Sequence, residues 1–284
     1  MIEIRNKNTA AVLFSVNAEH LVGADLREAD LSEADLSQQD LRHANLSHAD
    51  LSYANLEQAQ LQGALLIGSA LMHAKLDAAD LSGARLSEGT PFSAAILSQA
   101  SLHQAQLVNA DLRHADLHQA NLAYADLSNA SFQCADLHQA NLRSARLCGA
   151  MFIDANLCAS DLKYTYLCDA HFNGANLMNA DLTDAKLHGD DTHQPTTLVG
   201  ANLTRAILVG ACLRHTILKN ANLFHADLRN ADLSYALLGG AHLRNANVAG
   251  AEFTGVELAA VVMDFANFSQ AKNADIPYYK KNLR

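Results

Sequence analysis

The sequence is poor in several residue types, and each shortage narrows the range of structures it can form. Tryptophan is absent, aromatic residues make up 6% of the chain, and only three of its 284 residues are proline. Half of the residues are nevertheless hydrophobic, so leucine and alanine supply almost all of the apolar mass. A composition this biased indicates internal repeats.

Long hydrophobic runs and closely spaced cysteine pairs are missing as well. No apolar stretch approaches the roughly 18 residues that a membrane-spanning helix needs. The apolar run at residues 10–16 is short for the hydrophobic part of a secretion signal. The five cysteines include no Cys-x-x-Cys pair, and an odd number favours reduced thiols over a disulfide framework. We therefore expect a cytoplasmic protein without membrane contacts.

Basic residues are fewer than acidic residues in this sequence. The chain has 20 Lys and Arg residues against 30 Asp and Glu, which gives a formal net charge of −10. Proteins that are held on nucleic acid or on anionic lipid need a positive surface. The charge balance therefore argues against direct nucleic-acid binding and indicates neutral or basic partners.

A leucine stands at every fifth position from Leu21 to Leu86, usually with Ala two residues before it and Asp or Asn directly before it. After an interruption at 89–91, where we expect a one-residue bulge, the series resumes with Phe92 and Leu97 and runs to Leu187. A final run begins at Leu198, and the whole pattern ends near residue 270.

A period of five fits neither an α-helix nor a flat strand. On a helix, each step of five turns about 140°, so the leucines would wander around the cylinder. On a strand, an odd step would send successive leucines to opposite faces. The pattern is satisfied if the backbone turns about a right angle every five residues and every Leu and Ala points to one axis. Four such sides close a coil of twenty residues.

Residues twenty apart should then resemble one another, and they do. Phenylalanines at this spacing predict a stack of rings inside the coil, which Phe92 joins once one inserted residue is discounted. Glutamines two residues after the leucine predict an outer ladder of amides: Gln38, Gln58, Gln99, Gln119 and Gln139. The residues expected to pack the interior include Leu26, Leu46, Leu117, Phe132, Phe152 and Phe172.

Units such as Ala24-Asp25-Leu26-Arg27-Glu28 and Ala44-Asn45-Leu46-Ser47-His48 resemble the A(D/N)LXX motif of pentapeptide repeat proteins. The resemblance covers about residues 19–270. It implies an all-β fold, a right-handed quadrilateral parallel β-helix, also called a β-solenoid. The repeats present here would form about twelve coils, and at about 4.8 Å per coil these would span roughly 58 Å.

The ends of such a solenoid need caps, because open coils would expose backbone edges and core leucines. Residues 1–18 are expected to form the N-terminal cap, with short strands at Ile2–Arg5 and Thr9–Phe14. The β-helix then occupies residues 19–187 and 198–270, separated by a projecting loop at 188–197, and residues 271–284 form a C-terminal tail or cap. No linker and no second domain are expected.

The C-terminal coils hold more apolar residues than one coil needs, and two interpretations stay open. The tail from Asp275 to Arg284 covers the end coil, or a second copy of the chain does so in a homodimer. The residues of the candidate dimer contact are Val256, Val261, Met263 and Phe265.

No residue pattern indicates catalysis, a cofactor or a metal. His118 and His138 should stack on adjacent coils, but a zinc site needs three or four ligands. Cys148 and Cys168 fall in equivalent positions with an expected Cα separation of about 4.8 Å, within disulfide range, although reduced thiols remain the favoured interpretation. Common nucleophile, metalloprotease and nucleotide-binding motifs are absent. We therefore expect a protein without enzymatic activity.

With its axis filled by side chains, the coil leaves only its outer faces for function. We therefore expect a scaffold that binds an unidentified partner protein. The candidate contact residues lie in the acidic first third and in the projecting loop, where function often resides on a rigid scaffold: Glu28, Glu33, Glu57, Asp190, Asp191 and His193.

The family resemblance implies an alternative function. Some members imitate DNA in width and charge, occupy the DNA groove of a type II topoisomerase such as gyrase, and protect it from quinolones or toxins. About 58 Å of B-DNA carries about 34 charges, at one per 1.7 Å, whereas the whole chain carries −10. Only residues 1–94, with 13 acidic and 6 basic residues, approach that density. Topoisomerase binding is therefore the second interpretation.

Overall fold

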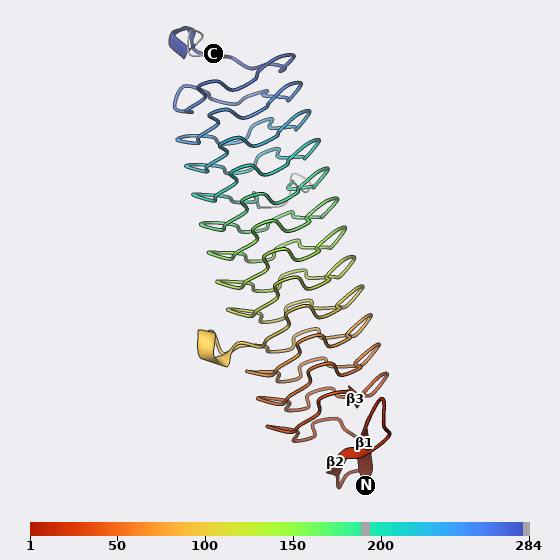
Figure 1. Cartoon of the computed structure of the whole chain (residues 1–284). Coiled ribbons are helices and arrows are strands. Elements are labelled where there is room, and N and C mark those ends of the chain that lie inside the picture. The colour runs from red at the N-terminus through yellow and green to blue at the C-terminus, as the bar shows by residue number, and fades with distance from the viewer. Residues whose placement is uncertain (189–193, 281–284) are drawn as a thin grey trace. The chain divides into compact units, whose positions relative to one another are not determined.

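The computed structural model describes residues 1–188 and 194–280. The chain forms two compact units, Met1–Ala145 and Arg146–Arg284, and each consists of stacked turns of backbone (Figure 1). The longer elements of the described residues are strands β1 (Ile2–Asn6), β2 (Val12–Val16) and β3 (Ala34–Asp35) and the 3₁₀ turns η1 (Pro91–Ser93) and η2 (Tyr278–Lys280). No helix in this part of the chain is long and apolar enough to cross a membrane.

The rest of the backbone pairs with itself in parallel, at a spacing of twenty residues. Asp25 pairs with Asn45 in the first unit, and Asn202 pairs with Asn222 in the second. The N–H of Leu26 donates to the carbonyl oxygen of Asn45 at 2.8 Å. Because the leucines recur every five residues, each coil has four sides. This is the pairing of a parallel β-helix.

Each side ends in a tight turn that begins at the central leucine. The carbonyl oxygen of Leu21, for example, accepts the N–H of Ala24 at 3.1 Å. The second residue after the leucine has a positive φ, which favours glycine. At Gly63, with φ +64°, a Cβ would also lie 2.7 Å from Nδ1 of His43 in the neighbouring coil. Glycine is therefore favoured there both by the backbone and by the neighbouring ring.

The Asp or Asn before each leucine stabilises the same turn from outside. Oδ1 of Asp30 accepts the backbone N–H of Ser32 at 3.1 Å, and Oδ1 of Asn45 accepts that of Ser47 at 3.1 Å. A side-chain acceptor bonded to the backbone two residues on is the Asx turn, which explains why these two residue types recur at this position.

Leucine and alanine side chains fill the axis of each unit. The six residues expected in the interior are all fully buried: Leu26, Leu46, Leu117, Phe132, Phe152 and Phe172. The rings of Phe152 and Phe172 stack with centroids 4.8 Å apart and planes 5° apart. Where a hydroxyl replaces alanine, it can donate to a backbone carbonyl of the same turn, as at Thr216, whose Oγ1 donates to the carbonyl oxygen of Leu213 at 2.7 Å.

The interruption near residue 89 is larger than the expected one-residue bulge. Ala70 pairs with Ile96, so the spacing steps from 20 to 26 residues, and six residues are inserted. They include η1, which projects from the coils of the first unit (Figure 1). Phe92 lies on this turn and is 97% exposed, so its assignment to the interior was wrong. In the sequence, one extra residue plus a normal repeat looks the same as an insertion of six.

The same insertion divides the predicted glutamine ladder. Lys75 pairs with Ser101, and this register places Gln38 and Gln58 at a different corner from the later glutamines. Only the later glutamines, Gln99, Gln119 and Gln139, form the predicted hydrogen-bonded ladder. Nε2 of Gln99 donates to Oε1 of Gln119 at 3.0 Å, and Nε2 of Gln119 donates to Oε1 of Gln139 at 2.8 Å.

The second interruption has the same length. His171 pairs with Thr197, again 26 residues on, so six residues are inserted within the predicted loop 188–197. Three of its residues had been expected to contact a partner, and they lie outside the described residues: Asp190, Asp191 and His193.

The N-terminal strands cap the first unit. β1 and β2 pair antiparallel, with Ile2 opposite Val16, and β1 also pairs with β3, with Asn6 opposite Ala34. Since β3 is part of a coil, the strand pair closes the end of the solenoid. β2 starts later than expected because a turn precedes it, in which the N–H of Ala10 donates to the carbonyl oxygen of Asn6 at 2.9 Å.

The tail after residue 270 covers the end of the second unit, and its ammonium group at Lys280 makes several of the contacts. Nζ of Lys280 donates to the carbonyl oxygens of Leu258 at 3.1 Å and of Ala259 and Val261 at 2.6 Å each. The bond to Val261 takes the place of the N–H donor that a following coil supplies elsewhere, as Val262 does for Ala241. Burial lowers the pKa of Lys280 from its ordinary value.

Most of the surplus apolar side chains near the C-terminus are buried within the chain itself. Val256, Val261 and Met263 occupy interior positions with exposed fractions of 7%, 1% and 5%, whereas Phe265 is 61% exposed. Val256, Val261 and Met263 therefore cannot form the predicted dimer contact, because buried side chains cannot reach a second copy. Of the four residues, only Phe265 is available at the surface.

The substitution Phe152→Ala should lower the free energy of unfolding by about 3–5 kcal/mol, because it removes a fully buried ring and leaves a cavity. The matched control, Phe92→Ala, removes an exposed ring and should change this free energy by less than about 0.5 kcal/mol. Guanidinium denaturation followed by circular dichroism measures both. Equal losses would contradict the placement of the two rings.

Candidate functional site

Outward side chains form columns, because residues twenty apart stack on adjacent coils. The rings of His118 and His138 lie 5.1 Å apart and nearly parallel, at 9°. Each imidazole is also bonded within its own repeat, as between Nδ1 of His118 and Oδ1 of Asp116 at 2.7 Å. Among the residues that the structure describes, no group of three or more His, Cys, Asp or Glu side chains is placed to hold a metal ion.

Four outward aspartates each form an ion pair with an arginine of their own repeat. In the unit Asp25-Leu26-Arg27, Nε of the arginine donates to Oδ1 at 2.8 Å and Nη2 donates to Oδ2 at 2.7 Å. These hydrogen bonds from Arg27 lower the pKa of Asp25 to about 2. We call this pair of hydrogen bonds an Asp–Arg clamp. The same clamp recurs in three further units: Asp40 with Arg42, Asp111 with Arg113 and Asp227 with Arg229.

The three glutamates expected to contact a partner do not lie on one side of the coil. Glu28 is an exposed corner residue. The carboxylate of Glu33, at the next corner, accepts hydrogen bonds from the Asn6 and Asn8 side chains at 3.2 and 3.1 Å, so it holds the N-terminal cap in place. These two bonds also lower its pKa. Glu57 lies on a further side, with Oε1 3.8 Å from Nζ of Lys75.

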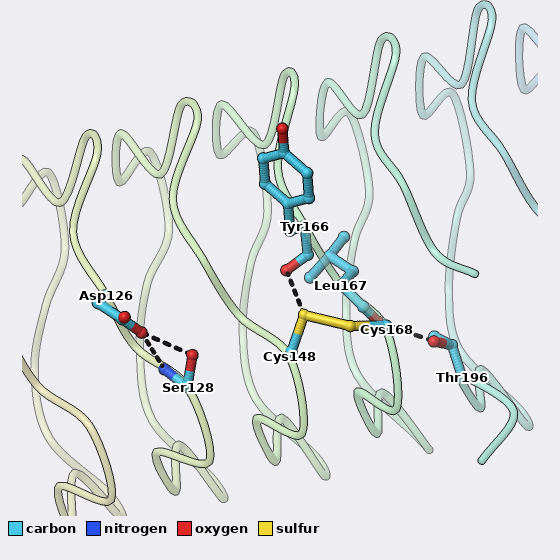
Figure 2. The surroundings of a disulfide bond; sticks show 7 residues. All are labelled: Asp126, Ser128, Cys148, Tyr166, Leu167, Cys168 and Thr196. Atoms are coloured by element: carbon cyan, nitrogen blue, oxygen red, sulfur yellow. Dashed lines mark hydrogen bonds between the residues drawn. A yellow bond between two sulfur atoms is a disulfide. The ribbon is translucent and has the colours of Figure 1, made fainter. Parts of the chain in front are cut away.

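Cys148 and Cys168 form a disulfide bond, with their Cα atoms 4.6 Å apart (Figure 2). Both follow the central leucine in adjacent coils of the second unit, so the stacking itself brings them within bonding range. The preference for reduced thiols was wrong for this pair. Free cysteines also occur: Cys134, Cys158 and Cys212.

Two surface features were missed by the sequence analysis. The first is a set of exposed apolar residues in the first unit: Phe92 on η1, and Met72 and Ile96, which are 40% and 41% exposed. The second is a cleft of about 710 Å³ in the second unit, lined in part by Arg214 and Tyr235. The available signal was the appearance of apolar residues in outward positions that usually hold polar ones.

A family model described as pentapeptide repeats matches most of the chain, at residues 20–58, 54–90, 89–122, 110–149, 130–163, 150–189, 196–220, 221–259 and 236–272. This chain belongs to the pentapeptide repeat family. The match agrees with the five-residue sides seen in both units of this pentapeptide repeat protein.

Solved structures of other family members are similar to it. HetL, a protein of the cyanobacterium Nostoc involved in the regulation of heterocyst differentiation, is 32% identical, with 83% of this chain and 91% of HetL covered and a TM-score of 0.56. The plasmid-mediated fluoroquinolone resistance protein QnrB1 is 16% identical, with 83% and 91% covered and a TM-score of 0.39. A protein of the Arabidopsis thaliana thylakoid lumen is 27% identical, with 45% and 75% covered and a TM-score of 0.18. No curated protein sequence matches the chain.

Removing the disulfide with Cys148→Ser should lower the free energy of unfolding by about 3 kcal/mol, because the bond closes a loop of twenty residues in the unfolded chain. Cys134→Ser, at a free cysteine, serves as the control and should cost little. Denaturation with and without reductant measures both variants and the wild type. A wild-type stability that does not respond to reductant would contradict the bond.

The clamp at Asp25 predicts a pH effect with a defined sign. Because folding lowers the pKa of this carboxyl from 3.8 to about 2, its contribution to stability is present above the ordinary pKa and is lost as the pH falls towards 2. The substitution Arg27→Gln should return the pKa towards 3.8, whereas Arg229→Gln should leave it unchanged. Titration of the carboxyl carbon by NMR measures the shift. A wild-type Asp25 that titrates near 3.8 would refute the clamp.

Proposed function

We propose that this chain is a non-enzymatic scaffold that binds a partner protein through its outer faces. Its interior holds packed Leu, Ala and Phe side chains, so the described surface is where a partner can bind. The observation that carries the proposal is Phe92, which is 97% exposed on a turn projecting from the first unit (Figure 1). Aromatic residues, Phe among them, are enriched at protein interfaces relative to the rest of the surface.

The turn that presents Phe92 is held in one conformation by its neighbours. Oγ of Ser93 accepts the backbone N–H of Glu88 at 3.0 Å and donates to the carbonyl oxygen of Thr90 at 3.0 Å. Pro91 restricts the backbone at the first position of the turn. A ring fixed in this way loses little conformational entropy when a partner covers it, which favours binding.

The partner surface should combine an apolar pocket with neutral or basic surroundings. Met72 and Ile96 are further exposed apolar residues of the first unit, and the first 94 residues carry 13 acidic against 6 basic side chains. The similarity to HetL, which is involved in regulating heterocyst differentiation, supports a regulatory role.

Topoisomerase binding by DNA imitation is the second candidate, and the acidic excess of residues 1–94 favours it. The Asp–Arg clamps weaken this case. They neutralise carboxylates within the repeat, whereas the phosphates of DNA all present unpaired charge to a partner. We therefore rank it below binding through Phe92.

Affinity capture from the native host tests the proposal. The wild-type protein should retain a partner that Phe92→Ala loses by at least about tenfold, the scale of one interface anchor. Tyr124→Ala, which removes a 54%-exposed ring of the same unit, should retain it. Equal capture by wild type and Phe92→Ala would refute the proposed surface.

A gyrase supercoiling assay tests the second candidate function. Inhibition of supercoiling, or protection of gyrase from quinolones, at micromolar protein would favour topoisomerase binding.

A further inference from the structure

The cleft in the second unit contains an arginine that lacks the usual clamp of its repeat position. In the four Asp-Leu-Arg units the guanidinium is held at 2.7 Å by its own aspartate. In Cys212-Leu213-Arg214 a cysteine occupies that place. Nη1 of Arg214 lies 3.9 Å from Oδ2 of Asp232, and its buried Nε has no acceptor among the described residues. The Arg214 side chain is 43% exposed, so an added anion can approach it from solvent.

A row of flat rings stands next to Arg214. His215 and Tyr235 stack with centroids 5.0 Å apart and planes 8° apart, and His188 lies 5.2 Å from His215 at a tilt of 42°. The Tyr235 ring is backed by Gly255, where a Cβ would come within 2.5 Å of it. Because His215 and Gly255 hold the ring in place, Tyr235, which is 47% exposed, offers a fixed aromatic edge to a bound group.

The remaining wall of the cleft is aliphatic. Ile217 and Leu237 pair in parallel on adjacent coils and occupy the position before the central leucine, which usually holds Asp or Asn. Leu237 is 48% exposed, so this apolar surface faces solvent in the described structure. A cleft of about 710 Å³ falls in the size range of small-molecule sites.

These features together define the chemistry of a ligand. A guanidinium binds a carboxylate through two parallel hydrogen bonds, while the stacked rings and the two aliphatic side chains accept an apolar ring or branched chain. We propose that this cleft binds a small carboxylic acid that carries such an apolar group, with Arg214 holding the carboxylate and Tyr235, Ile217 and Leu237 holding the apolar part. The site is independent of the Phe92 surface, which belongs to the other unit.

The absence of tryptophan makes a direct fluorescence test possible, because an indole ligand is then read without an indole background from the protein. Indole-3-propionate is titrated with the full-length protein, and saturable binding with a dissociation constant of about 1 mM or tighter is expected. Indole-3-propionamide, which has the same ring and no charge, should bind at least about tenfold more weakly.

Variants of the chain assign the contacts. Arg214→Gln should weaken binding of indole-3-propionate at least about tenfold, and Tyr235→Ala should weaken it about fivefold or more. Arg229→Gln removes a clamped arginine from the same repeat position elsewhere and should leave binding unchanged. Circular dichroism checks that each variant is folded. The proposal is overturned if the wild type shows no saturable binding, if the amide binds as tightly as the acid, or if folded Arg214→Gln binds like the wild type.

Discussion

The structure depends on one constraint, which is that every fifth side chain must reach a common axis. A leucine in that position is buried only if the backbone turns after each side, and the turn requires a positive φ two residues later. The Asp or Asn before the leucine bonds to the backbone of the same turn, so core packing and turn formation are encoded in the same five residues. Each unit gains its long-range order by repeating this five-residue combination of buried leucine and tight turn.

Stacking also explains the surface. Residues in equivalent positions lie one coil apart, so similar side chains become neighbours without any further design. The paired Gln99 and Gln119 amides, the parallel His118 and His138 rings and the Cys148–Cys168 disulfide all arise from the twenty-residue spacing. The same rule makes departures informative, because Ile217 and Leu237 replace polar residues in adjacent coils at the edge of a cleft.

The sequence was sufficient to predict the period, the four-sided coil and the buried residues, because each depends only on local spacing. It was insufficient wherever the chain left the repeat. The position of Phe92 was mispredicted because the five-residue pattern cannot distinguish an extra residue from an extra residue plus one whole side. The spacing already placed Cys148 and Cys168 within disulfide range, but their state was mispredicted because the odd cysteine count was taken to favour reduced thiols. The cleft was missed because its residues come from separate repeats and only their three-dimensional stacking unites them.

The two six-residue insertions show what the coil leaves unconstrained. In both, the leucine before and the leucine after are eleven residues apart, and the pairing returns to a spacing of twenty in the following coil. At the insertion that holds η1, the N–H of Ala95 donates to the carbonyl oxygen of Leu86 at 2.8 Å, so the chain leaves and re-enters the coil at one corner. Corners are thus the points at which evolution or protein engineering can add new segments to this fold, since only the two points of attachment must be preserved.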